Sequence, residues 1–144
     1  MRPRAFHQLA TRLASSEDPA DLRTAISRAY YAVYHVAREI LEGASFRISK
    51  GPAGHAEVFR CLSNCGIPEL QRMSSDLGDL RSRRNDADYD LKNEYVELPS
   101  TARYYAKTSE NIIRALEACQ NEPQRSKLIS GVKLYLSKIG PGSR

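Results

Sequence analysis

The stretch LRTAISRAYYAVYHVAREIL, residues 22–41, carries one continuous apolar face. Its apolar side chains recur at spacings of three and four residues, as they do on the buried face of an α-helix. Asp18-Pro19 places an N-cap residue and a first-turn proline before the stretch, and Gly43 ends the apolar run. The stretch therefore predicts a long central helix of a helical bundle. Its apolar positions are Leu22, Ile26, Ala29, Val33, Val36, Ala37, Ile40 and Leu41.

Polar and aromatic side chains line one edge of the same predicted helix. At about 100° per residue, two arginines, a tyrosine and a histidine fall within an arc of about 80° beside the apolar face. Four such groups are suited to line a cleft, and the histidine fits a hydrogen-bonded position between helices as well as a functional one. The four are Arg28, Tyr31, His35 and Arg38, whereas Tyr30 and Tyr34 lie nearer the apolar arc and are expected in the core.

An arginine interrupts a second apolar stripe. The stripe repeats at spacings of three and four residues, and Arg84 takes its next position. A guanidinium on a core-facing stripe is costly unless a carboxylate meets it, and Asp88 lies four residues on, within reach on the same helix face. We therefore expect a polar site around Arg84, which is either a structural ion pair or a functional site. The stripe consists of Leu70, Met73, Leu77 and Leu80.

The rest of the chain also has helical periodicity, without strand alternation, internal repeats or a glycine-rich phosphate loop. These patterns predict an all-α fold, an up-down bundle of four or more helices within a single domain of residues 1–139, followed by a disordered tail, residues 140–144. The remaining helices are expected around Phe6–Leu13, from His55 to Leu62, from about Pro68 to about Tyr89, from Ala102 to Cys119 and from Leu128 to Ile139.

Composition limits the classes of protein that fit. No stretch of the 144 residues is long and apolar enough to span a bilayer, and Met1-Arg2-Pro3-Arg4 leads into an amphipathic segment rather than a signal peptide, so we expect a cytoplasmic protein. Cys61 and Cys65 would share a helix face, but two thiols lack the ligand count of a structural zinc site. These two and Cys119 are expected as free thiols, with no metal or cofactor. The net charge of +5, with a pI near 9.2, permits an anionic partner.

Two segments resemble the signatures of a known family. AISRAYYAVYH, residues 25–35, resembles the first signature of HEPN-domain proteins of the small bacterial and archaeal type, and LRSRRNDADYD, residues 80–90, resembles the second. Gly54-His55, followed by Val58-Phe59, is similar to a weaker motif between them. The resemblance covers about residues 22–90, and the order and separation of the motifs make their combination more specific than either one.

The resemblance implies a helical bundle that usually dimerises, often encoded beside a minimal nucleotidyltransferase or within defence and toxin–antitoxin systems. Many HEPN proteins are metal-independent ribonucleases in which an arginine is followed, after a gap of four to six residues, by a histidine, and the two are paired across the dimer. Arg84-Asn85 matches the start of this motif. The histidine is missing, because the corresponding positions are Tyr89, Asp90 and Leu91.

The resemblance, together with these residues, implies two possible functions. The first is an RNA-associated HEPN protein that binds RNA and has weak or no ribonuclease activity; the second is a non-catalytic dimeric module that partners a minimal nucleotidyltransferase or an antitoxin. Metal-free RNA cleavage needs a cation and proton-transfer groups. Arg84 supplies the cation, and Asp88, His35 and His55 are the candidates for proton transfer, among which His35 is favoured. The expected RNA-binding residues are Arg28, Tyr31, Arg38, Arg81, Arg83, Asn85 and Tyr89.

Overall fold

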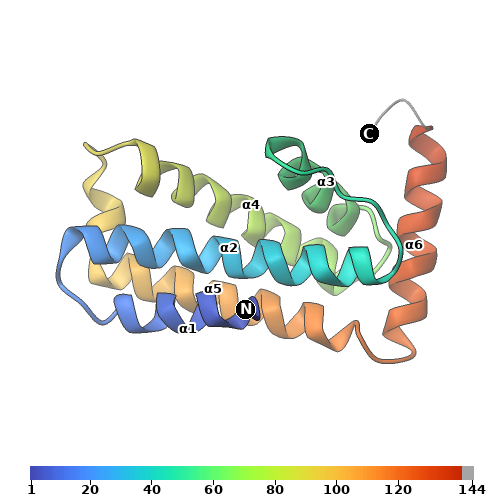
Figure 1. The fold of residues 1–144 in the computed structure, drawn as a ribbon, viewed down its shortest axis with the longest axis horizontal. Coiled ribbons are helices and arrows are strands. Elements are labelled where there is room, and N and C mark those ends of the chain that lie inside the picture. Colours follow the sequence, from blue (N-terminus) through green and yellow to red (C-terminus); the bar gives the residue numbers. More distant parts are fainter. Residues whose placement is uncertain (141–144) are drawn as a thin grey trace.

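The computed structural model describes residues 1–140, and every regular element in this range is helical. The predicted all-α fold is therefore confirmed for these residues, and of the predicted disordered tail all but Gly140 lies outside them. Six α-helices and one short 3-10 helix follow one another along the chain (Figure 1): α1 Arg4–Leu13, α2 Pro19–Gly43, α3 Pro52–Ser63, α4 Pro68–Tyr89, η1 Glu94–Glu97, α5 Pro99–Ala118 and α6 Gln124–Ile139.

Local sequence explains where most of these helices begin. A proline in the first turn of a helix lacks an N–H that would have had no partner there, and its fixed φ suits the helix. The carboxylate of Asp18 also caps α2, because it accepts a hydrogen bond from the backbone N–H of Ala20 at 2.8 Å. The prolines that begin helices are Pro19, Pro52, Pro68 and Pro99.

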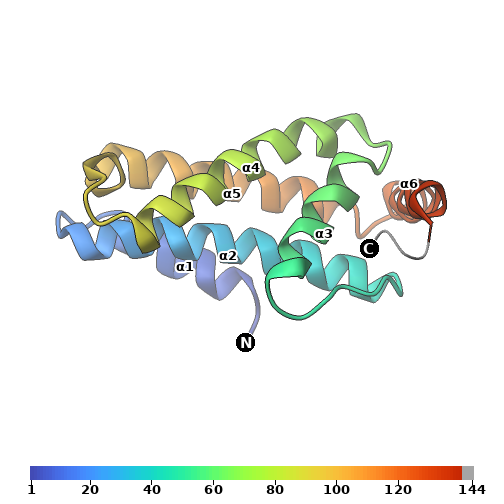
Figure 2. The ribbon, with the colours of Figure 1, turned by 90° about the horizontal axis from the view of Figure 1, so that it is seen from above.

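Helix α2 is central in the bundle and contacts α1, α3, α4, η1 and α5. Helices α1, α2, α4 and α5 run in alternating directions along the long axis of the molecule (Figure 1), which is the predicted up-down order. Seen from above, α3 crosses the bundle and α6 is viewed nearly end-on (Figure 2), so α6 lies across the end of the bundle and departs from that order.

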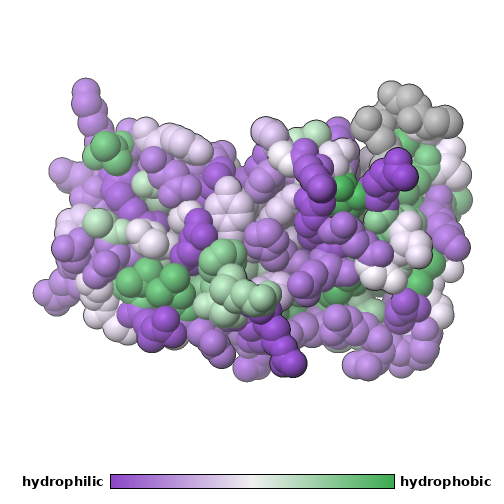
Figure 3. All heavy atoms as spheres, in the orientation of Figure 1, coloured by the Kyte–Doolittle hydropathy of each residue, from purple (hydrophilic) through white to green (hydrophobic). Residues whose placement is uncertain are grey.

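The core lies along the predicted apolar face of α2. Leu22, Ile26 and Leu41 are completely buried, and α4 and α5 supply buried leucines opposite them. Tyr30 and Tyr34 are also buried, as their position near the apolar arc predicted. The surface that carries α1 and α2 is mostly hydrophilic, with smaller hydrophobic groups below its centre (Figure 3). Among residues 1–140, no helix has the length and apolar character needed to cross a membrane.

A buried arginine fixes the end of α4. Arg23 of α2 is only 8% exposed, and its guanidinium donates hydrogen bonds to the carbonyl oxygens of Ala87 and Asp90, each at 3.0 Å. It also donates to the carbonyl of Asn93 at 3.0 Å and to the carboxylate of Glu97 at 2.8 Å. These bonds satisfy carbonyls that the end of a helix leaves without partners. Arg23 therefore joins α2, the last turn of α4 and η1.

The loop between α2 and α3 is held from both sides. Arg38 of α2 donates to the carbonyl oxygens of Ile48 and Ser49 at 3.1 and 3.0 Å, and Glu57 of α3 accepts a hydrogen bond from the backbone N–H of Ser49 at 2.7 Å. Gly54 lies so close to this loop that an added Cβ would stand 2.3 Å from the carbonyl oxygen of Ser49. The close approach requires glycine at this position and fixes the first turn of α3.

Helix α6 rests on the turn between α3 and α4. A Cβ added to Gly131 would stand 1.6 Å from the carbonyl oxygen of Cys65, so the two backbones meet where only glycine fits. Leu128 and Val132, which share this face of α6 with Gly131, are buried. Cys61, Cys65 and Cys119 are buried, and the structure of residues 1–140 joins none of them in a disulfide bond, as predicted.

Candidate functional site

The candidate site lies where α4 packs against α2, around Arg84. The Arg84 side chain is 14% exposed, and its Nε lies 3.1 Å from the Oδ2 of Asp88, so the predicted ion pair forms. The Nε atom is buried and makes no hydrogen bond within residues 1–140, so its contact with Asp88 is ionic. Asp88, whose side chain is 29% exposed, also accepts a hydrogen bond from the hydroxyl of Ser27 at 3.1 Å. The pair is half-buried and bridges α4 to α2.

The guanidinium of Arg84 is surrounded by tyrosines. One terminal nitrogen donates to the hydroxyl of Tyr31, and the other donates to the side-chain oxygen of Asn85 at 2.7 Å. The guanidinium carbon lies 5.0, 5.8 and 5.6 Å from the ring centroids of Tyr31, Tyr30 and Tyr89. Cations are attracted to aromatic faces at such distances. The rings therefore replace part of the hydration that Arg84 loses on its core-facing stripe.

A second arginine lies on the same tyrosine. The guanidinium carbon of Arg28 is 4.9 Å from the ring centroid of Tyr31 and 4.7 Å from that of Phe6, and one of its nitrogens donates to the hydroxyl of Ser27 at 3.4 Å. Tyr31 thus contacts both Arg28 and Arg84, two of the predicted site residues. The result is a half-buried cluster of cations and aromatic rings shared by α1, α2 and α4.

His55 reaches this cluster from the first turn of α3. Its Nδ1 lies 2.6 Å from the hydroxyl of Tyr30, and its ring stacks on Tyr34 with the centroids 4.2 Å apart. Burial lowers the pKa of His55, and the positive charges of Arg81 and Arg84 lower it further. Burial raises the pKa of the Tyr30 hydroxyl to about 12. At neutral pH both partners of this hydrogen bond are therefore uncharged.

His35 lies near Phe6 of α1 and Tyr31 of α2. Its ring centroid is 5.8 Å from that of Phe6 and 6.2 Å from that of Tyr31. Burial lowers the pKa of His35, and the positive charge of Arg38 lowers it further, whereas the negative charge of Glu39 raises it. Arg84 contacts the rings of Tyr30 and Tyr31, and those same rings lie 5.7 and 5.9 Å from His55. Of the histidines considered from the sequence, the structure brings His55 closer to the environment of Arg84 than the favoured His35.

The other predicted arginines, Arg38, Arg83 and Arg81, differ in the partners that the structure gives them. Arg38 is bonded to the loop after α2 and also donates to the hydroxyl of Tyr34 at 2.9 Å, so the structure ties it to that loop and does not bring it to Arg84. Arg83 lies 3.5 Å from a carboxylate oxygen of Asp86 and 5.9 Å from the ring centroid of Tyr95. The described residues give Arg81 no ion pair.

Sequence reasoning missed Arg23, although it is more buried than Arg84. Its position could have been found, because Arg23, Ser27, Tyr30 and Tyr34 repeat at spacings of four, three and four on the side of α2 that faces α4. No group of three or more acidic, histidine or cysteine side chains within residues 1–140 is arranged to hold a metal ion.

Comparisons with known proteins gave no match: no family model, no curated protein and no solved structure matches this chain.

Proposed function

We propose that this chain is a HEPN-type RNA-associated protein that binds single-stranded RNA, with weak or no ribonuclease activity, in a defence or toxin–antitoxin context. The observation that carries the proposal is the exposed ring of Tyr89, 74% accessible to solvent, beside the guanidinium of Arg84. An accessible aromatic ring beside cations is suited to stack on an unpaired base while the cations contact phosphates.

The cations beside this ring supply candidate phosphate contacts. Arg28 and Arg84 both contact the ring of Tyr31. Arg81 is half-buried without an ion pair in the described part of the chain. A guanidinium without a carboxylate partner keeps its donors free for a phosphate oxygen. Arg81 is therefore the arginine of the second motif that we expect to contribute most to RNA affinity.

The same geometry argues for weak cleavage. Metal-free cleavage needs a group that takes the proton of the 2′-hydroxyl and a donor for the leaving oxygen, besides a cation for the phosphorane. Arg84 is suited to the cation's role, but Asp88 is already held by Arg84 and Ser27. His55 is the best-placed proton acceptor, but it is a weak base, because burial and the charges of Arg81 and Arg84 lower its pKa and its Nδ1 is bonded to Tyr30.

RNA binding is tested by fluorescence anisotropy with a labelled single-stranded RNA of mixed sequence. We expect modest affinity at low salt and a log–log slope against salt concentration of about −0.7 for each phosphate neutralised. Tyr89→Ala should weaken binding about tenfold, because a stacked base is worth about 1–3 kcal/mol. Tyr104→Ala is the matched control, since Tyr104 is an exposed tyrosine of α5.

The phosphate contact of Arg81 has its own control. Arg81→Ala should reduce the salt slope by about 0.7. Lys133→Ala should leave the slope unchanged, because Lys133 is an exposed cation of α6, away from the α2–α4 interface. Failure of the wild-type protein to bind RNA at low salt would contradict the proposal.

A second function is favoured by exposed apolar side chains after the end of α4. Leu91 is 76% exposed, and Tyr95 and Leu98 are each 47% exposed. These three side chains lie within one segment of eight residues, 91–98, and apolar groups that lie together on a surface are typical of protein interfaces. They fit a dimeric, non-catalytic module that receives a minimal nucleotidyltransferase or an antitoxin. This function predicts no RNA binding at low salt and equal anisotropy for the wild type and Tyr89→Ala.

A further inference from the structure

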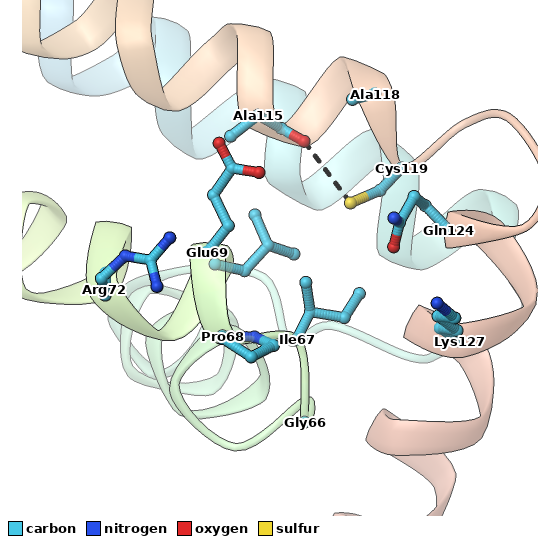
Figure 4. A pocket seen from close by; sticks show the side chains of 11 residues that line it. Gly66, Ile67, Pro68, Glu69, Arg72, Ala115, Ala118, Cys119, Gln124 and Lys127 are labelled. Atoms are coloured by element: carbon cyan, nitrogen blue, oxygen red, sulfur yellow. Dashed lines mark hydrogen bonds between the residues drawn. The ribbon is translucent and has the colours of Figure 1, made fainter.

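A cavity lies at the end of the bundle where α4 begins. It has a volume of about 570 Å³ and is bounded by the turn before α4, the last turn of α5 and the first turn of α6 (Figure 4). Small-molecule sites occupy about 300–1,000 Å³. From Leu70, beside the cavity, to Arg84 the helix rises about 21 Å, at about 1.5 Å per residue. The cavity is therefore separate from the candidate RNA site.

The floor of the cavity is apolar and uncharged. Ile67, Leu70, Ala115 and Cys119 line it and are all buried. The thiol of Cys119 donates to the carbonyl oxygen of Ala115 at 3.4 Å, and burial raises its pKa to about 11. The thiol therefore stays neutral at physiological pH. A ligand that covers this floor gains free energy by removing apolar surface from water.

Charged side chains stand around the floor. Arg72 of α4 and Lys127 of α6 lie on opposite sides of the cavity, and Glu69 extends toward α5 (Figure 4). None of the three forms an ion pair with a described residue, although Glu69 and Arg72 are three residues apart on one helix. The two cations outnumber the single carboxylate, so the rim has a net positive charge. An anionic group is therefore favoured between Arg72 and Lys127.

We propose that this cavity binds an organic carboxylate with an apolar body. The carboxylate lies between Arg72 and Lys127, and the apolar body covers Ile67 and Leu70. Glu69 disfavours a ligand that carries a second anionic group at its other end. This site binds its small molecule independently of RNA binding, because none of the residues that line the cavity belongs to the cluster around Arg84.

Three probes that share one ring system test the proposal: naphthoate, naphthylmethanol and naphthylmethylamine. Each is titrated into the full chain, and binding is followed by the backbone amide signals in heteronuclear NMR spectra. We expect naphthoate to bind most tightly and the amine most weakly. The shifts should be confined to residues 66–72, 115–119 and 124–127, with residues 81–89 unchanged.

Variants identify the groups that bind the carboxylate. Lys127→Ala and Arg72→Ala should each weaken naphthoate binding about threefold to tenfold, because a partly exposed charge contact is worth roughly a kilocalorie per mole. Neither should change the affinity for naphthylmethanol. Lys133→Ala, on the same helix but outside the cavity, is the control. Ala118→Phe, at an exposed position of the lining, should block all three probes without unfolding the protein.

Several results would overturn the proposal. They are the absence of binding by naphthoate, equal affinities for the three probes, and shifts outside the cavity. Naphthoate binding that is unchanged in both Lys127→Ala and Ala118→Phe would do the same. RNA binding plays no part in any of these measurements, so their failure leaves the proposed function untouched.

Discussion

The guanidinium of Arg84 donates a hydrogen bond to the hydroxyl of Tyr31, across the contact between α4 and α2. The same guanidinium neutralises Asp88 within its own helix. Arg84 thus takes an apolar position on α4 because an acceptor from the neighbouring helix and a carboxylate from its own helix both meet it. Asp88 keeps 29% of its side-chain surface accessible, so water shares in its solvation.

Arg84→Ala should lower the free energy of unfolding by about 1–2 kcal/mol, less than the 3–5 kcal/mol typical of a fully buried pair. Tyr31→Phe, which removes only the hydroxyl, should cost about 0.5–1.5 kcal/mol. The double variant Arg84→Met with Asp88→Leu should recover much of the loss, because no charge is left without a partner. Urea denaturation measures all three. Unchanged stability together with unchanged RNA binding in Arg84→Ala would contradict both roles of this residue.

We expect the isolated protein to cleave RNA slowly or not at all, because general acid–base assistance is worth about 10²–10⁴ in rate and the motif histidine is missing. The assay follows single-stranded RNA in EDTA over a pH series. Any activity should be lost in Arg84→Ala and His55→Ala and retained in His35→Ala, since the rings that contact Arg84 also contact His55. Loss in His35→Ala alone would restore His35 as the proton-transfer group, and rapid cleavage that survives all three changes would place the site elsewhere.

Acidification should destabilise the fold as the pH falls below about 6.5, the ordinary pKa of histidine. The folded-state pKa values of His55 and His35 are lowered, the former by burial and by Arg81 and Arg84. Between the folded and unfolded pKa values the unfolded chain binds more protons, so stability rises with pH there and levels off above the unfolded value. Urea midpoints over a pH series should show this, with a smaller change in His55→Gln. A midpoint that increases on acidification would contradict the lowered pKa values.

We expect a homodimer, since the exposed apolar groups after α4 lie beside the motif that carries Arg84. Sedimentation at tens of micromolar should give a dimer for the wild type, whereas Leu91→Lys should shift it toward the monomer. Leu134→Lys serves as the control, because Leu134 is also exposed, at 58%, but belongs to α6. A wild-type monomer under these conditions would count against the dimer.

Local sequence predicted the features that depend on neighbours along the chain. The start of α2 at Pro19, the extent of α4 and the pair of Arg84 with Asp88 follow from caps, periodicity and a spacing of four residues. These features need no knowledge of how helices pack. The burial of Tyr30 and Tyr34 was predictable for the same reason, since it follows from their place on the helical arc.

Contacts between distant residues escaped the sequence. Arg23 and Glu97 are separated by 74 positions, and Tyr30 and His55 by 25, so no periodic pattern pairs them. Arg38 was expected beside a cleft, yet it binds carbonyls of a loop whose conformation no local rule sets. The position of α6 across the end of the bundle likewise depends on the close approach of Gly131 to Cys65, which appears only after folding.

The bonds of Arg23 bear on how this molecule opens. The guanidinium of Arg23, near the start of α2, binds carbonyls at the end of α4, a carbonyl before η1 and a carboxylate of η1. None of these segments can separate from the others without leaving a buried charge unsolvated. Amides from about residue 86 to 97 should therefore exchange their hydrogens in one cooperative event together with those near Arg23, and not by gradual fraying from the helix end.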